Sequence, residues 1–245
     1  KVPQSNYVSC HMPMSGSKDI PHVQIHDHYI RKPLSTKEIS SISKFVRLAC
    51  VRDQSNPGAL TEANAYLNLF EEYESDKSYL KTAQSLLEKV LQAERGNRWA
   101  SLQIRCLFLE ESYQSLIDFY QANQSLLAKP DAWTNYRIGE AFLHTEPFAS
   151  AIQFLKTARD LKPKDLDFNN KLGEAYFKNK QMALASGQFK QVLSLYPKHI
   201  SANVNLAWCE HLSGRDMESI RYYKTALNLN PDYYTALTGL AQVYI

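Results

Sequence analysis

From residue 35 onward, apolar residues recur at steps of three and four positions, a spacing that predicts amphipathic helices. The first stretch begins behind a potential N-cap at Ser35 or Thr36 and ends before the helix breakers Pro57 and Gly58. Its apolar stripe consists of Ile39, Ile42, Phe45, Val46 and Ala49. Beyond it, helix-length apolar patterns alternate with short turns to the end of the chain, so we expect an all-α fold.

Three of these apolar runs close with a proline at a constant interval. Pro163, Pro197 and Pro231 are 34 residues apart and end the runs "ARDLKP", "VLSLYP" and "ALNLNP". The stretches "NYRIGEAF", "NKLGEAYF" and "NVNLAWCE" open the same three repeats, and "LTGLAQVY" opens a fourth. In this pattern, large residues fill the space between paired helices, small residues mark where helices touch, and proline ends the second helix.

The large and small residues recur in register. They are Ile138, Gly139, Phe142, Ala151, Leu155 and Ala158 in the first repeat, Leu172, Gly173, Tyr176, Ala185, Phe189 and Val192 in the second, Leu206, Ala207, Ser219, Tyr223 and Ala226 in the third, and Leu237, Leu240, Ala241 and Tyr244 in the fourth. On these residues the chain resembles the tetratricopeptide-repeat family over residues 132–245. The resemblance implies a solenoid of antiparallel helix pairs.

Weaker copies of the repeat precede residue 132. "NAYLNLFEEY" and "RWASLQIRCLF" begin 34 residues apart but lack the glycine and the proline. We therefore expect residues 34–131 to hold N-terminal helices and degenerate repeats. The chain ends at Ile245 within the first helix of a repeat, whose apolar face needs a cover. We expect the natural protein to extend beyond both Lys1 and Ile245, or a partner to cover the C-terminal face.

Residues 1–33 differ in composition from the rest of the chain. They hold four prolines and four of the seven histidines, namely Pro3, Pro13, Pro21, Pro33, His11, His22, His26 and His28. Because this segment has no helical period, we expect an irregular N-terminal arm.

The arm contains "YVSCHMP", which matches the c-type haem motif C-x-x-C-H with Tyr7 in place of the first cysteine. The wider stretch resembles the last haem-binding segment of periplasmic multihaem c-type cytochromes that continue into tetratricopeptide repeats. The matching residues are Cys10, His11, Met12, Pro13, Pro21, His22, Asp27 and His28. The resemblance implies haem c bound through a Cys10 thioether, an upstream cytochrome domain, and a periplasmic or extracellular location.

The same resemblance implies that His11 is the proximal iron ligand and that His22, His26 or His28 supplies the distal imidazole. Three interpretations remain open. Haem is held by one thioether and His11, with His22 or His28 opposite; or the site is a relic and the segment packs as an ordered arm; or the natural chain has a cysteine at position 7. A zinc site at His26 and His28 lacks a third ligand with characteristic spacing.

Composition and the absence of known motifs argue against nucleic-acid binding, a membrane span and catalysis. Lys and Arg number 28 against 25 Asp and Glu, a net charge of +3, which is too balanced to indicate nucleic-acid binding. No window approaches the about 18 apolar residues of a membrane span. We find no phosphate-binding glycine loop, G-x-S-x-G elbow or H-E-x-x-H helix, so we do not expect an enzyme. Cys50, Cys106 and Cys209 lie in helical patterns and are expected in the core.

In such a solenoid, the first helix of each pair lines the concave face. The residues that we expect there to contact a partner are Trp133, Tyr136, Glu140, Asn170, Glu174, Phe177, Val204, Trp208 and His211. Each aromatic residue of this set could instead pack in the core between helices. Trp133 and Trp208 are the better candidates for the groove. A terminal carboxylate is disfavoured as ligand because Glu140 and Glu174 would repel it.

The predicted function is a protein–protein interaction scaffold that holds a protein or an extended peptide in this groove, as part of an extracytoplasmic assembly. The alternative is an electron-transfer segment that binds haem through Cys10 and His11.

Overall fold

The structure, a computed structural model, describes residues 14–16, 24–26, 57–73 and 75–245. Two compact units make up the chain, residues 1–49 and residues 50–245. In the first unit, β1 (Met14–Gly16) pairs with β2 (Gln24–His26) in an antiparallel ladder that sets Met14 opposite His26. The sequence shows no sign of this short ladder, because strands of three residues are too short to show an alternating pattern.

Several predictions concern positions outside the described residues. They are the helix expected from residue 35, Cys50, and the haem candidates Cys10, His11, His22 and His28. For His26, the structure describes the strand to which it belongs. The haem hypothesis therefore stays a prediction.

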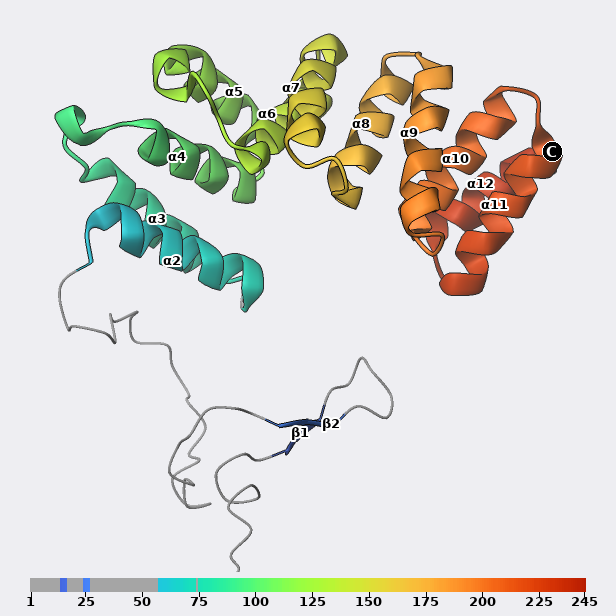
Figure 1. The fold of residues 1–245 in the computed structure, drawn as a ribbon, viewed down its shortest axis with the longest axis horizontal. Coiled ribbons are helices and arrows are strands. Elements are labelled where there is room, and N and C mark those ends of the chain that lie inside the picture. Colours follow the sequence, from blue (N-terminus) through green and yellow to red (C-terminus); the bar gives the residue numbers. More distant parts are fainter. Residues whose placement is uncertain (1–13, 17–23, 27–56, 74) are drawn as a thin grey trace, which may run out of the picture. The chain divides into compact units, whose positions relative to one another are not determined.

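From residue 57 onward the described chain is a succession of antiparallel helix pairs (Figure 1). Its α-helices are α2 (Ala59–Glu72), α3 (Lys77–Glu88), α4 (Asn97–Leu109), α5 (Tyr113–Ala122), α6 (Ala132–Thr145), α7 (Phe148–Leu161), α8 (Leu166–Lys178), α9 (Met182–Leu195), α10 (Ile200–Leu212), α11 (Asp216–Leu229) and α12 (Tyr234–Val243). Two short 3₁₀ turns, η1 (Gln92–Glu94) and η2 (Gln124–Leu127), follow the first two helix pairs, and Pro130 stands after η2. The all-α solenoid is confirmed for this part of the chain, and helix pairs are also present before residue 132.

Side chains at the repeat boundaries cap the first helix of the next pair. Asp131 accepts from the backbone N–H of Thr134 and begins α6, and Asp165 accepts from the N–H of Phe168 and begins α8. Asn169, the fourth residue of α8, donates from Nδ2 to the carbonyl oxygens of Pro163 and Asp165. Asn135 and Asn203 make the equivalent pair of bonds in the flanking repeats. A buried asparagine thus joins each of α6, α8 and α10 to the turn before it.

The core runs along the helix pairs as the repeat pattern predicts. Ile138, Leu172 and Leu206 are fully buried on the first helices, and Leu155, Phe189 and Tyr223 are buried on the second helices. Cys106 and Cys209 are also buried, as expected. Burial raises the pKa of each of these two thiols to about 12.

The first helices of successive pairs pack against one another, from α2 through α4, α6, α8 and α10 to α12. The second helices of neighbouring pairs in the described part do not pack together to the same extent. The inner face is therefore the surface formed by α2, α4, α6, α8, α10 and α12. None of the helices that the structure describes is long and apolar enough to span a bilayer.

Candidate functional site

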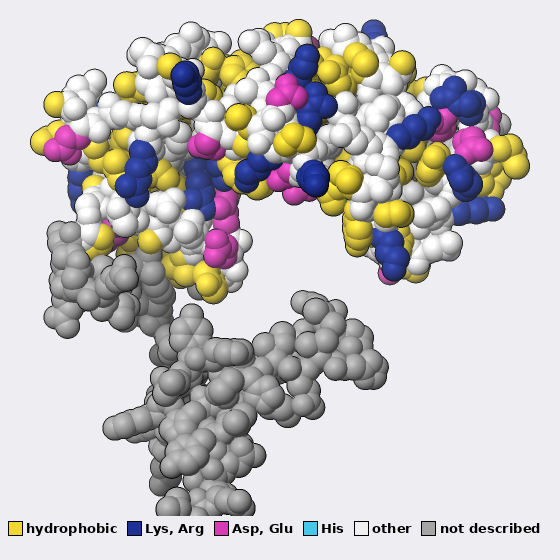
Figure 2. Space-filling model, viewed as in Figure 1, with side chains coloured by type: hydrophobic (Ala, Val, Ile, Leu, Met, Phe, Trp, Pro, Cys, Tyr) yellow, Lys and Arg dark blue, Asp and Glu magenta, His cyan; other side chains and the backbone are white. Residues whose placement is uncertain are grey.

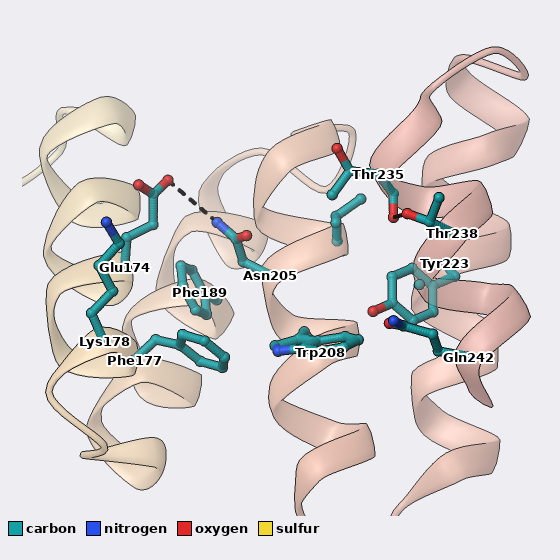
Figure 3. A pocket seen from close by; sticks show the side chains of 12 residues that line it. Glu174, Phe177, Lys178, Phe189, Asn205, Trp208, Tyr223, Thr235, Thr238 and Gln242 are labelled. Carbon is teal, nitrogen blue, oxygen red and sulfur yellow. Dashed lines mark hydrogen bonds between the residues drawn. The ribbon is translucent and has the colours of Figure 1, made fainter. Parts of the chain in front are cut away.

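An apolar pocket opens on the inner face between α8, α10 and α12, with a volume of about 380 Å³. Its floor consists of the buried side chains of Phe189, Val204 and Tyr223. Phe177 and Trp208, both half-buried, extend toward each other from α8 and α10 and form its walls (Figure 3). Aromatic walls around an apolar floor favour the burial of an apolar side chain.

Polar groups surround the opening of this pocket. Glu174 and Asn205 lie on one side, and Thr235, Thr238 and Gln242 of α12 lie on the other (Figure 3). The Glu174 Oε1 oxygen accepts from Asn170 Nδ2 at 3.0 Å and from Asn205 Nδ2 at 3.4 Å. Amide, hydroxyl and carboxylate groups beside an apolar pocket suit hydrogen bonds to the backbone of an extended ligand.

Lys171 joins two acidic residues of neighbouring first helices. Its Nζ lies 3.2 Å from Glu140 of α6 and 3.1 Å from Glu174 of α8. Burial disfavours the charge of Lys171, but the two carboxylates outweigh burial and raise its pKa. Lys171 offsets one of the two carboxylate charges, so the group keeps a net negative charge and the expectation that it repels a ligand carboxylate stays a prediction.

A second cavity of about 490 Å³ lies on the inner face between α2, α4 and α6. Charged residues line it, principally Glu71, Arg105, Asp131 and Arg137, together with Trp133. Arg105 donates to Asn64 and Asn68 of α2 and pairs with Glu71. We call this cavity the charged pocket and the first one the apolar pocket.

The predicted partner-binding residues divide between these two pockets and the packing around them. Glu174, Phe177, Val204 and Trp208 line the apolar pocket, and Trp133 lines the charged pocket. Trp133 keeps 38% of its surface exposed and lies 5.6 Å from the Arg137 guanidinium, measured to the ring centroid.

The remaining candidates take part in contacts within the solenoid. Tyr136 stacks on Phe168 with a centroid separation of 5.1 Å, inside an aromatic cluster between repeats. Asn170 is 7% exposed and donates to Glu174, and Glu140 pairs with Lys171. His211 pairs with Asp216 at 2.7 Å and is not among the pocket-lining residues.

Sequence reasoning missed several lining residues. Asn205, Thr238 and Gln242 each lie 34 positions after a residue of the same face, Lys171, Val204 and Trp208 respectively. The repeat period, applied to the predicted residues Val204 and Trp208, would have found Thr238 and Gln242, whereas Lys171 itself is not among the residues predicted to face the groove. Arg105 has no such signal, because it stands 34 positions before Gly139, where the repeat pattern has the glycine.

Charges of both signs are interspersed on the face of the solenoid seen in Figure 2, which agrees with the near-balanced composition. The part of the chain that the structure describes holds no group of three or more His, Cys, Asp or Glu arranged to bind a metal ion.

Residues 166–199, which comprise α8, α9 and the following turn, match the tetratricopeptide-repeat family model. No curated protein sequence matches the chain. Among solved structures, the tetratricopeptide-repeat protein YrrB is 18% identical with a TM-score of 0.58, over 74% of this chain and 89% of its own. MamA is 21% identical with a TM-score of 0.57, over 63% of this chain and 91% of its own. These likenesses show the tetratricopeptide-repeat fold.

Proposed function

We propose that this tetratricopeptide-repeat solenoid is an interaction scaffold that binds an extended peptide segment of a partner protein along its inner face. The observation that carries the proposal is the apolar pocket between Phe177 and Trp208 with polar groups around its opening. An apolar side chain of the peptide enters the pocket. The peptide backbone forms hydrogen bonds with Asn205, Glu174 and the polar side chains of α12. The proposal assigns no catalytic residue.

The comparison with YrrB supports a peptide as the occupant, because that protein is described as having an unusual peptide-binding site. The dimensions of the site support it as well. A cavity of about 380 Å³ accommodates one large side chain rather than a folded domain, and pockets for separate side chains combined with backbone hydrogen bonds are typical of extended-peptide recognition.

Selection from a displayed library of random peptides of about twelve residues, with the full chain as bait, tests the proposal. Binding of the enriched peptides is then measured by fluorescence anisotropy. Trp208→Ala and Phe177→Ala should each weaken binding by roughly tenfold or more, because an aromatic residue at the centre of an interface often contributes about 2 kcal/mol. Tyr196→Ala, which removes a half-exposed aromatic residue at the end of α9, is the matched control and should bind as the wild type does.

Circular dichroism melts of the variants separate lost binding from lost folding. If no peptide is enriched over repeated selections, or if folded Trp208→Ala binds the enriched peptides like the wild type, the proposal is wrong. Loss of helicity in Trp208→Ala would show that this side chain is part of the core, and Phe177→Ala would then decide the question.

A second candidate function rests on the "YVSCHMP" sequence: an electron-transfer segment that carries haem c on Cys10, located outside the cytoplasm because c-type haem is attached there. Bound haem would supply one-electron transfer. The test is a pyridine haemochrome spectrum and an intact mass of the chain expressed in a host that matures c-type cytochromes. A haem adduct on Cys10 supports this candidate, and a bare polypeptide mass overturns it.

A further inference from the structure

The guanidinium group of Arg137 is held between two aromatic rings at the charged pocket. Its Cζ lies 5.6 Å from the centroid of Trp133 and 6.0 Å from that of Phe108, on α6 and α4. The Arg137 side chain is 13% exposed, and its ion pair with Glu71 is long, at 3.5 Å. Contacts to ring faces leave the N–H groups at the edge of a planar guanidinium available for other acceptors.

Arg105 adds a second positive charge to the same cavity. Its terminal nitrogens donate to Asn64, Asn68 and Glu71, whereas its buried Nε has no hydrogen-bond partner among the described residues. Because that nitrogen is closed to solvent, Arg105 contributes to the cavity through its positive charge and not through this donor.

The acidic groups of the charged pocket already have partners. Asp131 accepts from both the N–H and the hydroxyl of Thr134 at 2.9 Å, as the cap of α6. Glu71 is shared between Arg105 and Arg137. The charged residues that line the pocket are balanced, two positive and two negative, and Lys162, whose Nζ lies 5.5 Å from the Trp133 ring, adds a positive charge beside them. With Lys162 included, the surroundings of Trp133 carry a small excess of positive charge.

We infer that the charged pocket binds the carboxylate of an aspartate or glutamate side chain in the same peptide that fills the apolar pocket. The inference rests on the proposed function. The carboxylate accepts two parallel hydrogen bonds from N–H groups of Arg137 other than the one that meets Glu71, a geometry that a planar guanidinium provides and an ammonium does not. Because Glu71 remains in the pocket, a singly charged carboxylate fits better than a doubly charged phosphate.

The test uses peptides enriched in the selection described above, each synthesised with every acidic residue replaced in turn by its amide. At one acidic position, the change to Asn or Gln should weaken binding by roughly tenfold, as expected for a lost hydrogen bond to a charged group. Arg137→Gln should weaken binding of the acidic peptide by a similar factor and leave binding of the amide peptide unchanged. Arg137→Lys should give an intermediate loss.

Two comparisons control this experiment. Arg221→Gln removes an exposed arginine of α11 and should bind both peptides as the wild type does. Raising the salt concentration should weaken the acidic peptide more than its amide form. If Arg137→Gln proves unfolded by circular dichroism, peptide binding by Arg137→Lys and the salt dependence of wild-type binding test the inference instead.

The outcomes separate this inference from the proposed function. Peptides that depend on Trp208 but show no acidic position sensitive to Arg137 overturn the inference and leave the proposed function standing. Tighter binding of a phosphoserine peptide than of the aspartate peptide overturns the choice of a carboxylate. The complete absence of enriched peptides overturns both this inference and the proposed function.

Discussion

Gly173 of α8 lies directly against the ring of Phe189 in α9. A methyl group added to Gly173 would place its carbon 2.5 Å from Phe189 Cε1 and 2.8 Å from both Cδ1 and Cζ. One repeat earlier, a methyl group on Gly139 would come within 2.7 Å of Leu155 Cγ. The missing side chain therefore lets the two helices of a pair approach closely, with a large residue of the second helix filling the space.

Gly173→Ala should lower the free energy of unfolding by about 1–3 kcal/mol, because the fully buried Phe189 ring has little room to move aside. Urea unfolding followed by circular dichroism measures the effect. Gly187→Ala on α9 is the matched control, since a methyl group there meets nothing within 4 Å. That variant should gain about 0.5–1 kcal/mol from the better helix propensity of alanine. Equal effects of the two substitutions would contradict the close-approach explanation.

Asn169→Ala should destabilise the protein by about 1–3 kcal/mol, because it leaves the carbonyl oxygens of Pro163 and Asp165 without their side-chain donor. Asn228→Ala, at an exposed position of α11, should change stability by no more than about 0.5 kcal/mol. Thermal melts of both variants provide the comparison. An Asn169→Ala protein as stable as Asn228→Ala would show that these bonds contribute nothing net.

Glu210 occupies the position that holds Phe142 and Tyr176 in the preceding repeats, and its side chain is 3% exposed. Its carboxylate pairs with Arg215 and lies 3.3 Å from Lys190 Nζ. Burial disfavours the charge, but hydrogen bonds from Arg215 and Lys190 outweigh burial and lower the pKa of Glu210 below its ordinary value of 4.5. Glu210→Gln should therefore lower the unfolding free energy near neutral pH by about 1–3 kcal/mol.

The difference between wild type and Glu210→Gln depends on pH. Because the pKa of Glu210 is lower in the folded chain than in the unfolded chain, its charge stabilises the fold fully above pH 4.5, and this contribution is lost as the pH falls through the folded-state pKa. Unfolding free energies of both proteins, measured from neutral to acidic pH, should therefore converge at the acidic end. A difference that stays constant would contradict the charge-based explanation.

Cys106 and Cys209 should resist alkylation in the native protein. With a pKa of about 12, each thiol is ionised to only roughly one part in ten thousand at about pH 8, and burial also blocks the reagent. Both should react after denaturation in urea. Iodoacetamide treatment followed by peptide mapping distinguishes these two cysteines from Cys10 and Cys50. Rapid native labelling of Cys209 would show that α10 opens locally.

The groove was only partly predictable from the pattern of residues. The repeat spacing predicts Trp208 and Phe177 on the same face, because a helix period determines which side chains share a face, and both line the apolar pocket. The same projection could not distinguish Trp208, which lines a pocket, from Tyr136, which stacks on Phe168. That difference depends on the neighbouring repeat, and the ring of Phe168 covers Tyr136.

The 34-residue repeat by itself determined the all-α class, the pairing of helices and the buried positions such as Leu172 and Leu206, because each repeat must bury the same apolar face against its neighbours. The tertiary structure alone decided which polar groups meet across repeats. Lys171 reaches both Glu140 and Glu174, and Arg137 reaches Glu71 of α2, 66 positions away in the chain. These contacts depend on how successive first helices stack, and a sequence period specifies which residues face a neighbour without specifying which side chains come within bonding distance.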